Sequence, residues 1–220
     1  MDCPSPPGKG WYALLALPVA SALLALQYHH FALKAGVAGG GILILVLLQV
    51  RSARAARDAW MILGAFLFSI GGDWFLSHRH GLPERFLAGI GLFFLAHVGY
   101  LAFSLMNGRL HRGMTLIVLA GYLALFFLKI RPAIHSPLLL AAVLGYLLIS
   151  CFSLGAAAGL QARPAVKWPY VCGIGLVLFS DTLIAFSEFA AWKEGNFLIL
   201  PTYYLAQISL TLAIMAKSRK

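Results

Sequence analysis

The sequence predicts an all-α, polytopic integral membrane protein with about eight transmembrane helices. Of its 220 residues, 61% are hydrophobic and only 11% are charged, whereas about 25% are charged in a typical soluble domain. Apolar runs close to the roughly 20 residues that a helix needs to cross a bilayer recur along the whole chain. Short polar segments separate these runs. We therefore expect one transmembrane helical domain over residues 1–220.

Eight apolar segments define the expected helices. In chain order they are Trp11–Tyr28, Phe31–Val50, Asp58–Ser77, Phe86–Met106, Gly113–Ile130, Ser136–Cys151, Trp168–Ser187 and Asn196–Met215. The first segment resembles a secretory signal, but the charge pattern of the loops fits only eight spans, so we expect it to be retained. Residues 1–10 form a short segment before the first helix, and residues 216–220 form a basic tail.

The basic residues favour one orientation, because cytoplasmic loops of membrane proteins carry an excess of Lys and Arg. With the N-terminus in the cytoplasm, eleven basic residues fall on the cytoplasmic side and six on the other side. The cytoplasmic set is Lys9, Arg51, Arg54, Arg57, Arg109, Arg112, Arg163, Lys167, Lys217, Arg219 and Lys220; the other set is Lys34, Arg79, Arg85, Lys129, Arg131 and Lys193. We expect both termini in the cytoplasm, in a bacterial inner membrane or, in a eukaryote, in the endoplasmic reticulum.

Composition argues against two other classes of protein. The net charge of +10 is not gathered into a basic stripe with interleaved aromatic residues, so we expect no nucleic-acid partner. Cys3, Cys151 and Cys172 form no CxxC pair, so neither a disulfide framework nor a structural zinc site is expected. Membrane lipid is the expected partner, and the oligomeric state stays open.

Two aspartates lie inside apolar spans: Asp73 in GAFLFSIGGDWFL and Asp181 in GIGLVLFSDTLIAF. A charged Asp at the centre of a spanning helix costs about 2.5–3.5 kcal/mol on insertion scales, so such residues usually serve a function. A helix rises 1.5 Å per residue, which places Asp73 about 22 Å along an outward-running helix. Asp181 lies at a similar depth.

Other polar residues fall near the same depth. Lys34, Tyr203 and Tyr204 come early on inward-running helices, Gln207 lies somewhat deeper, and His97 is nearest the midplane. We therefore expect one buried polar pocket in the outer half of the membrane. Glycines such as Gly71, Gly72 and Gly89 let helix backbones approach closely, and should bring the third and fourth helices together around Asp73.

A short internal similarity suggests two related halves. FLFSIGGD resembles GLVLFSD, and each is followed after 22 to 24 residues by a polar pair, His97 with Tyr100 and Tyr204 with Gln207. Both pairs have i,i+3 spacing and so share one helix face. Two four-helix halves would meet at a pocket, as repeats do in some transporters.

At these residues the sequence resembles the YhhN-like membrane proteins, which include the lysoplasmalogenases. The matching pieces are FSIGGDWFL (68–76), GLFFLAHVGY (91–100), LFSDTLIAF (178–186) and PTYYLAQ (201–207), together with Lys34 early in the second span. The family tends to have proline after that lysine, whereas this chain has Ala35. The resemblance implies a hydrolase that cleaves the vinyl-ether bond of lysoplasmalogens, releasing a fatty aldehyde and glycerophosphoethanolamine or glycerophosphocholine.

This chemistry assigns roles to the buried residues. Hydrolysis protonates the β-carbon of the vinyl ether, and water captures the resulting oxocarbenium ion; two carboxyl groups in different surroundings can divide these tasks. We assign Asp73 as the acid and Asp181 as the carboxylate that stabilises the cation and orients water, although the reverse order is also open. His97, Tyr203 and Tyr204 are expected to position these groups and pass protons.

The expected substrate-binding residues are Lys34, Tyr100, Gln207, Arg79 and Arg85. Lys34, with Arg79 or Arg85 at the outer mouth, suits a lipid phosphate. No cofactor and no metal are expected. A single mid-span histidine argues against a zinc centre built on several imidazoles, although a metal held by carboxylates stays open.

Other interpretations are open from sequence alone. A small-solute or proton-coupled transporter would also use buried carboxylates and repeated halves, and a non-catalytic lipid-binding protein is a third possibility. An aspartate could serve only as the structural partner of Lys34. We also expect one of Tyr203 and Tyr204 to face lipid, and Glu188 to be a solvated helix-end residue rather than part of an entrance.

Overall fold

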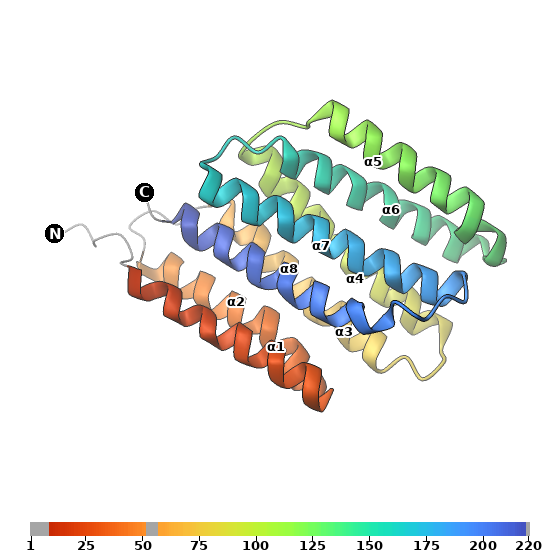
Figure 1. Ribbon diagram of the computed structural model, residues 1–220, viewed down its shortest axis with the longest axis horizontal. Helices are drawn as coiled ribbons and strands as arrows, with labels where there is room; N and C mark the ends of the chain where they lie inside the picture. The colour runs from red at the N-terminus through yellow and green to blue at the C-terminus, as the bar shows by residue number, and fades with distance from the viewer. Residues whose placement is uncertain (1–8, 52–56, 219–220) are drawn as a thin grey trace.

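The computed structural model describes residues 9–51 and 57–218, and within these ranges the chain is helical with no β-strand (Figure 1). Cys3, Arg54, Arg219, Lys220 and most of the predicted 1–10 segment lie outside them. The long helices are α1 (Ala16–Tyr28), α2 (Phe31–Arg51), α3 (Ala59–Ser77), α4 (Pro83–Met106), α5 (Arg112–Leu125), α6 (Pro137–Ala158), α7 (Pro164–Phe189) and α8 (Asn196–Lys217). A 3-10 turn, Lys9–Leu15, leads into α1, and a π-helical segment, Phe126–Ile130, extends α5.

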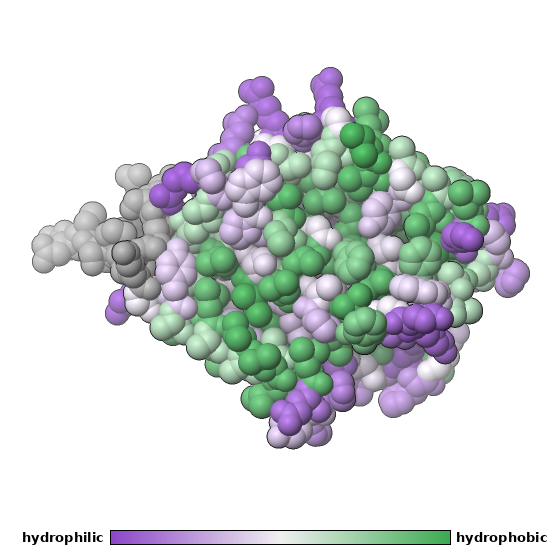
Figure 2. All heavy atoms as spheres, viewed as in Figure 1, coloured by the Kyte–Doolittle hydropathy of each residue, from purple (hydrophilic) through white to green (hydrophobic). Residues whose placement is uncertain are grey.

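The described helices match the eight expected spans. All eight, with the short turns that extend the first and fifth, are long and apolar enough to cross a membrane. Figure 2 shows a mostly hydrophobic surface with hydrophilic residues gathered toward the ends of the helices. Large apolar side chains such as Leu23 on α1 and Ile117 on α5 are exposed, as expected of residues that face lipid. The fold is therefore an all-α polytopic membrane protein.

Several helix ends differ from the expected ones for identifiable reasons. α4, α6 and α7 each begin with a proline in the first turn, where the missing N–H is not needed, so α4 and α7 start several residues earlier than expected. α6 continues to Ala158 rather than ending at Cys151, because its last turns carry small residues that pack inside the protein. Ser136 caps α6 by accepting from the Leu139 N–H at 3.4 Å.

Six helices form a closed ring. Going round it, α2 packs on α3, α3 on α4, α4 on α6, α6 on α7, α7 on α8, and α8 back on α2. The two remaining helices lie outside the ring, with α1 against α2 and α5 against α6 (Figure 1). Asp73, Asp181, Lys34, His97, Tyr203 and Gln207 all lie on ring helices.

The packing order repeats in two halves, α1–α4 and α5–α8. In each half the first helix lies outside the second, and the second packs on the third and the third on the fourth. The halves meet where the fourth helix of each packs on the second helix of the other, as α4 does on α6 and α8 does on α2. This arrangement agrees with the internal similarity of the sequence.

Glycines set the close approach of α3 and α4. A methyl group built at Gly72 would lie 2.7 Å from the Phe93 ring, and one at Gly89 would lie 2.9 Å from Leu76. At Gly99 it would lie 2.7 Å from the backbone oxygen of Met61. As expected, these glycines hold the two helices together on either side of Asp73.

A polar cluster joins three helices at one end of the ring, near the N- and C-terminal ends of the described chain. Lys217 of α8 forms an ion pair with Asp58, which precedes α3. Asn107 at the end of α4 donates to the Asp58 carboxylate at 2.7 Å and accepts from the Lys217 ammonium at 2.6 Å. This cluster ties α3, α4 and α8 together at the end opposite the α3–α4 and α7–α8 loops.

We predict that Gly99→Ala lowers the stability of the protein by about 1–3 kcal/mol, the usual cost of overpacking. The added methyl group would meet a backbone oxygen, which cannot rotate away. Gly91, on the same helix, is exposed and has no atom within 4 Å of the position of an added methyl group. Gly91→Ala should therefore be neutral or stabilising by about 0.5–1 kcal/mol.

Denaturant unfolding in detergent measures both effects. Equal stability of the two variants would contradict this account of how α3 and α4 pack.

Candidate active site

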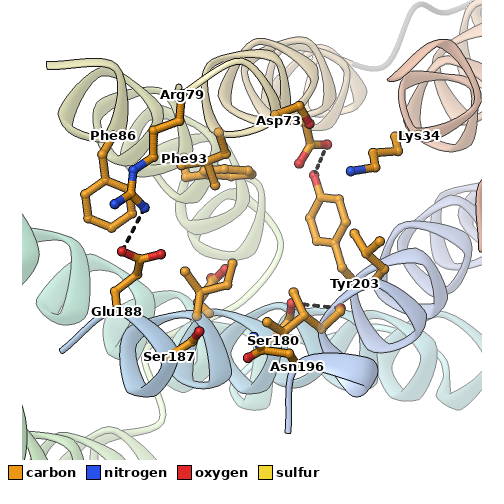
Figure 3. Close-up of a pocket in the computed structure, with 16 residues that line it drawn as sticks. Lys34, Asp73, Arg79, Phe86, Phe93, Ser180, Ser187, Glu188, Asn196 and Tyr203 are labelled. Carbon is orange, nitrogen blue, oxygen red and sulfur yellow. Dashed lines mark hydrogen bonds and ion pairs between the residues drawn. The ribbon is translucent and has the colours of Figure 1, made fainter. Parts of the chain in front are cut away.

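A cavity of about 280 Å³ lies inside the ring toward the α3–α4 and α7–α8 loops. Its lining comes from α2, α3, α4, α7 and α8 and from the α3–α4 loop (Figure 3). The polar lining residues are Lys34, Asp73, Ser77, Arg79, Ser180, Asp181, Ser187, Glu188, Asn196 and Tyr203. Apolar side chains, among them Leu76, Phe86, Phe93 and Ile184, make up the rest of the wall. The structure thus brings both intramembrane aspartates to one cavity.

Asp73 of α3 is held by a tyrosine from α8. The Tyr203 hydroxyl donates to Asp73 Oδ2 at 3.0 Å. Figure 3 shows the Lys34 side chain, from α2, pointing toward this pair. Lys34 forms no ion pair within 4.0 Å with any described residue. Asp73 is therefore not a structural ion-pair partner of Lys34. The lysine ammonium is available to an anion in the cavity.

Asp181 of α7 has a different set of neighbours. The Tyr146 hydroxyl, from α6, donates to Asp181 Oδ2 in a short hydrogen bond. His97 Nε2, from α4, lies 3.8 Å from the same oxygen. The His97 and Tyr146 rings meet edge to face with their centroids 5.4 Å apart. Asp181 therefore has a phenol and an imidazole beside it, where Asp73 has a phenol and an ammonium.

The two sets of neighbours come from equivalent helices. Asp73, on the third helix of its half, meets residues from the second helix of the same half and the fourth helix of the other half. Asp181 does the same, through Tyr146 on α6 and His97 on α4. The helices around the two aspartates are equivalent, but the side chains that these helices supply differ. The two carboxyl groups therefore have different chemical surroundings.

An ion pair lies at the mouth of the cavity. Arg79 Nη1 is 2.7 Å from Glu188 Oε2, and the Arg79 guanidinium also lies 4.7 Å from the centre of the Phe86 ring. The two side chains come from the α3–α4 loop and the end of α7, on opposite sides of the opening (Figure 3). Glu188 is exposed near the end of α7, as expected, and it also lines the cavity. Arg85 does not line the cavity and instead donates to the His78 backbone oxygen.

Several buried polar groups lie behind the cavity wall. His97, Tyr204 and Gln207 are each at most 2% exposed, and their side-chain polar atoms have no hydrogen-bond partner within the described ranges. The Tyr100 hydroxyl is 3.5 Å from Ser69 Oγ. Unpaired buried polar groups cost free energy. Of these three residues, His97 lies beside Asp181, which points to a role other than packing.

The expectation that one of Tyr203 and Tyr204 faces lipid is wrong. Tyr203 is 6% exposed and Tyr204 is 2% exposed. Adjacent positions on a helix point about 100° apart, but α8 has α7 on one side and α2 with α1 on the other, so both directions are covered. Tyr203 lines the cavity and Tyr204 does not, although both belong to one buried cluster with Ala22, Ala25 and Val37.

The structure separates the predicted site residues into three groups. Lys34, Asp73, Asp181, Tyr203 and Arg79 line the cavity; His97, Tyr100, Tyr204 and Gln207 are buried behind it; Arg85 lies outside it. Tyr146 was not predicted, although a tyrosine far from both ends of an apolar span is a recognisable polar signal. Ser180 and Asn196 were also missed, and Ser180 donates to the Ile199 backbone oxygen at 3.0 Å, fixing α7 against α8.

The chemistry available in the cavity is that of acids, bases and charges. Three carboxyl groups, a phenol, an ammonium and a guanidinium line the same space, and the His97 imidazole is buried beside Asp181. Within residues 9–51 and 57–218, no three His, Cys, Asp or Glu side chains are grouped closely enough to hold a metal ion. The arrangement suits proton transfer to a bound amphiphile and charge stabilisation beside it.

The comparisons with known proteins agree with the sequence motifs. The model of the YhhN family matches residues 33–214, which include every residue of the cavity lining. No curated protein matches the chain, and neither does any solved structure. Since the match covers most of the chain, the protein belongs to the YhhN family.

Proposed function

We propose that the protein is a lysoplasmalogenase, which hydrolyses the vinyl-ether bond of a 1-alkenyl glycerophospholipid that has lost its second chain. The products are a fatty aldehyde and glycerophosphoethanolamine or glycerophosphocholine. One observation carries the proposal: Asp73 and Asp181, from the two halves of a YhhN-family chain, line one membrane-buried cavity in different surroundings. The reaction needs an acid and a base in a site that a lipid can reach.

In the proposed reaction, one aspartic acid gives its proton to the β-carbon of the vinyl ether, and the adjacent carbon becomes an oxocarbenium ion. The second aspartate, as an anion, stabilises this cation and takes a proton from the water that attacks it. The hemiacetal then collapses to the aldehyde and the glycerol hydroxyl group. One water is consumed, and the proton taken by the second aspartate restores the acid.

We assign Asp73 as the acid. Lys34 and Arg79 bring two positive charges to the cavity, against three carboxyl groups from Asp73, Asp181 and Glu188. One neutral aspartate would balance these charges before substrate binds. The Asp181 carboxylate accepts from Tyr146 and lies beside His97, so it has groups that can hold it as an anion and carry a proton away.

The phosphate of the lipid has a matching site at the outer part of the cavity. Lys34 faces the cavity without an ion-pair partner within 4.0 Å among the described residues, and Asn196 adds a carboxamide to the same wall. Arg79 is occupied by Glu188 in this structure. We therefore assign the phosphate to Lys34, with Arg79 as a second contact when its pair with Glu188 opens.

The alternative, a small-solute or proton-coupled transporter, shares the buried carboxylates and the repeated halves, but the cavity opens toward one end of the ring. The half of the ring near Asp58 and Lys217 is filled by a cluster of buried apolar side chains that includes Phe66, Phe103 and Tyr170. The cavity lies in the other half, toward the Arg79–Glu188 pair. A site reached from one end and from lipid suits an enzyme acting on a membrane amphiphile.

One prediction of the proposed function concerns the two carboxyl groups. Purified wild-type protein should release aldehyde from a lysoplasmalogen, and Asp73→Asn and Asp181→Asn should each lose about 10²–10⁴-fold in rate, the usual contribution of an acid or base. Tyr203→Phe, which removes only the hydrogen bond to Asp73, should lose about tenfold in rate, equivalent to about 1.4 kcal/mol.

Glu84→Gln is the matched control, because Glu84 is exposed and does not line the cavity. Thermal unfolding of each variant identifies any that fail to fold. If folded wild-type protein released no aldehyde but moved a solute into sealed vesicles, the transporter would replace the hydrolase. Near-wild-type turnover by either asparagine variant would remove that aspartate from the mechanism.

Another prediction of the proposed function concerns the binding of the lipid phosphate. Lys34→Met should weaken the binding of a lysolipid with an uncleavable saturated ether chain about tenfold, which is 1.4 kcal/mol. Glu188→Gln should strengthen binding about threefold, since Arg79 then lacks its carboxylate partner. Isothermal titration in detergent measures both.

Lys129→Met is the control for the lysine, since Lys129 is exposed at the end of the π-helical segment and outside the cavity. If Lys34→Met and Lys129→Met bound the lipid equally well, the assignment of the phosphate to Lys34 would be wrong.

A further inference from the structure

An apolar groove of about 60 Å³ lies beside the polar cavity, between α4, α6 and α7. Its lining is Leu76, Phe86, Ile90, Phe93, Val143, Tyr146, Asp181, Ile184, Ala185 and Phe189. Apart from the Asp181 carboxyl group and the Tyr146 hydroxyl, these side chains are hydrocarbon. The groove ends at Phe86 and Phe189, whose rings meet edge to face with centroids 6.1 Å apart.

The groove adjoins the polar cavity. Leu76, Phe86, Phe93, Asp181 and Ile184 line both spaces. Beyond these shared residues the surroundings diverge, because the cavity continues to Lys34 and Asn196 while the groove continues to Ile90 and Val143. A molecule that fills both must have a charged part and a hydrocarbon part, joined close to Asp181.

The groove is open on one side. α4 and α7 both line it, and α6 lies between them in the ring. Hydrocarbon in the groove exchanges with hydrocarbon of the bilayer at little cost. The groove therefore determines where a hydrocarbon chain lies, and adds little to the affinity with which the chain binds.

We propose that the groove between α4, α6 and α7 binds the hydrocarbon chain of a single-chain amphiphile whose phosphate lies at Lys34. This assignment rests on the proposed function for the identity of the amphiphile, but the geometry of the groove is independent of catalysis. The chain enters sideways from the bilayer through this groove. The bond that joins chain to headgroup then lies at the boundary between groove and cavity, beside Asp181.

A second apolar groove of about 60 Å³ lies on the other face of α6, lined by α5, the π-helical segment, α6 and α7. It shares only Asp181 with the polar cavity. Tyr146, bonded to Asp181, lies between this groove and the first one. A chain placed there would have to pass the Tyr146–Asp181 hydrogen bond to reach the headgroup site, so the first groove is the better fit.

Two tryptophan variants distinguish the grooves. Ile90 lines only the first groove and Leu147 only the second. Ile90→Trp should weaken binding of a hexadecyl-ether lysophosphocholine about tenfold and leave binding of the butyl-ether analogue within about twofold. Leu147→Trp should leave both unchanged. The dependence on chain length separates a blocked groove from a general loss of structure.

A third variant covers the case in which Ile90→Trp does not fold. Phe189→Ala opens the end of the groove, so it should gain affinity for a lysophosphocholine with a branched phytanyl chain while keeping wild-type affinity for the hexadecyl probe. Equal loss of the hexadecyl and butyl probes in Ile90→Trp, no loss of either, or a selective loss in Leu147→Trp would overturn the assignment of the chain.

These probes bind without being cleaved, so the result is independent of turnover. If the hexadecyl probe behaves as expected but no aldehyde is released from a lysoplasmalogen, the chain site stands and the hydrolase proposal is wrong. If aldehyde is released and Ile90→Trp binds and turns over long chains normally, the hydrolase proposal stands and the chain site is wrong.

Discussion

The structure depends on keeping two aspartates inside a membrane. A carboxyl group surrounded by hydrocarbon needs polar neighbours supplied by other helices, because water is scarce there. The six-helix ring meets this requirement, since each aspartate has polar neighbours from one helix of its own half and one of the other half. The glycines that narrow the α3–α4 contact and the polar cluster at Asp58 hold the ring in this arrangement.

The repeated architecture also explains how two identical side chains can have different tasks. Asp73 and Asp181 occupy equivalent places, but a lysine and a phenol accompany the first, and an imidazole and a phenol accompany the second. Charge and hydrogen bonding decide which of two carboxyl groups keeps a proton. The two aspartates are the same residue type, but their neighbours differ. This difference supports the proposal that one acts as an acid and the other as a base in the same cavity.

Much of this arrangement follows from the sequence, because hydropathy and helical rise are local properties. They predict the eight helices, the shared depth of Asp73, Asp181 and Lys34, and the approach of α3 to α4 at glycines. The order of helices round the ring depends on contacts between distant segments, so the pairing of Tyr146 with Asp181 and of Arg79 with Glu188 could not be read from spacing. For the same reason both Tyr203 and Tyr204 are buried, although adjacent residues point in different directions.

The most direct test of the central claim, that Asp73 and Asp181 act together on one bound substrate, is a double-mutant cycle. The rate of aldehyde release would be measured for the wild type, Asp73→Asn, Asp181→Asn and the double variant. Residues that act as a unit are strongly non-additive, so we expect the double variant to be little slower than the slower single variant. Multiplicative losses would show that the two carboxyl groups act independently, and would contradict a shared site.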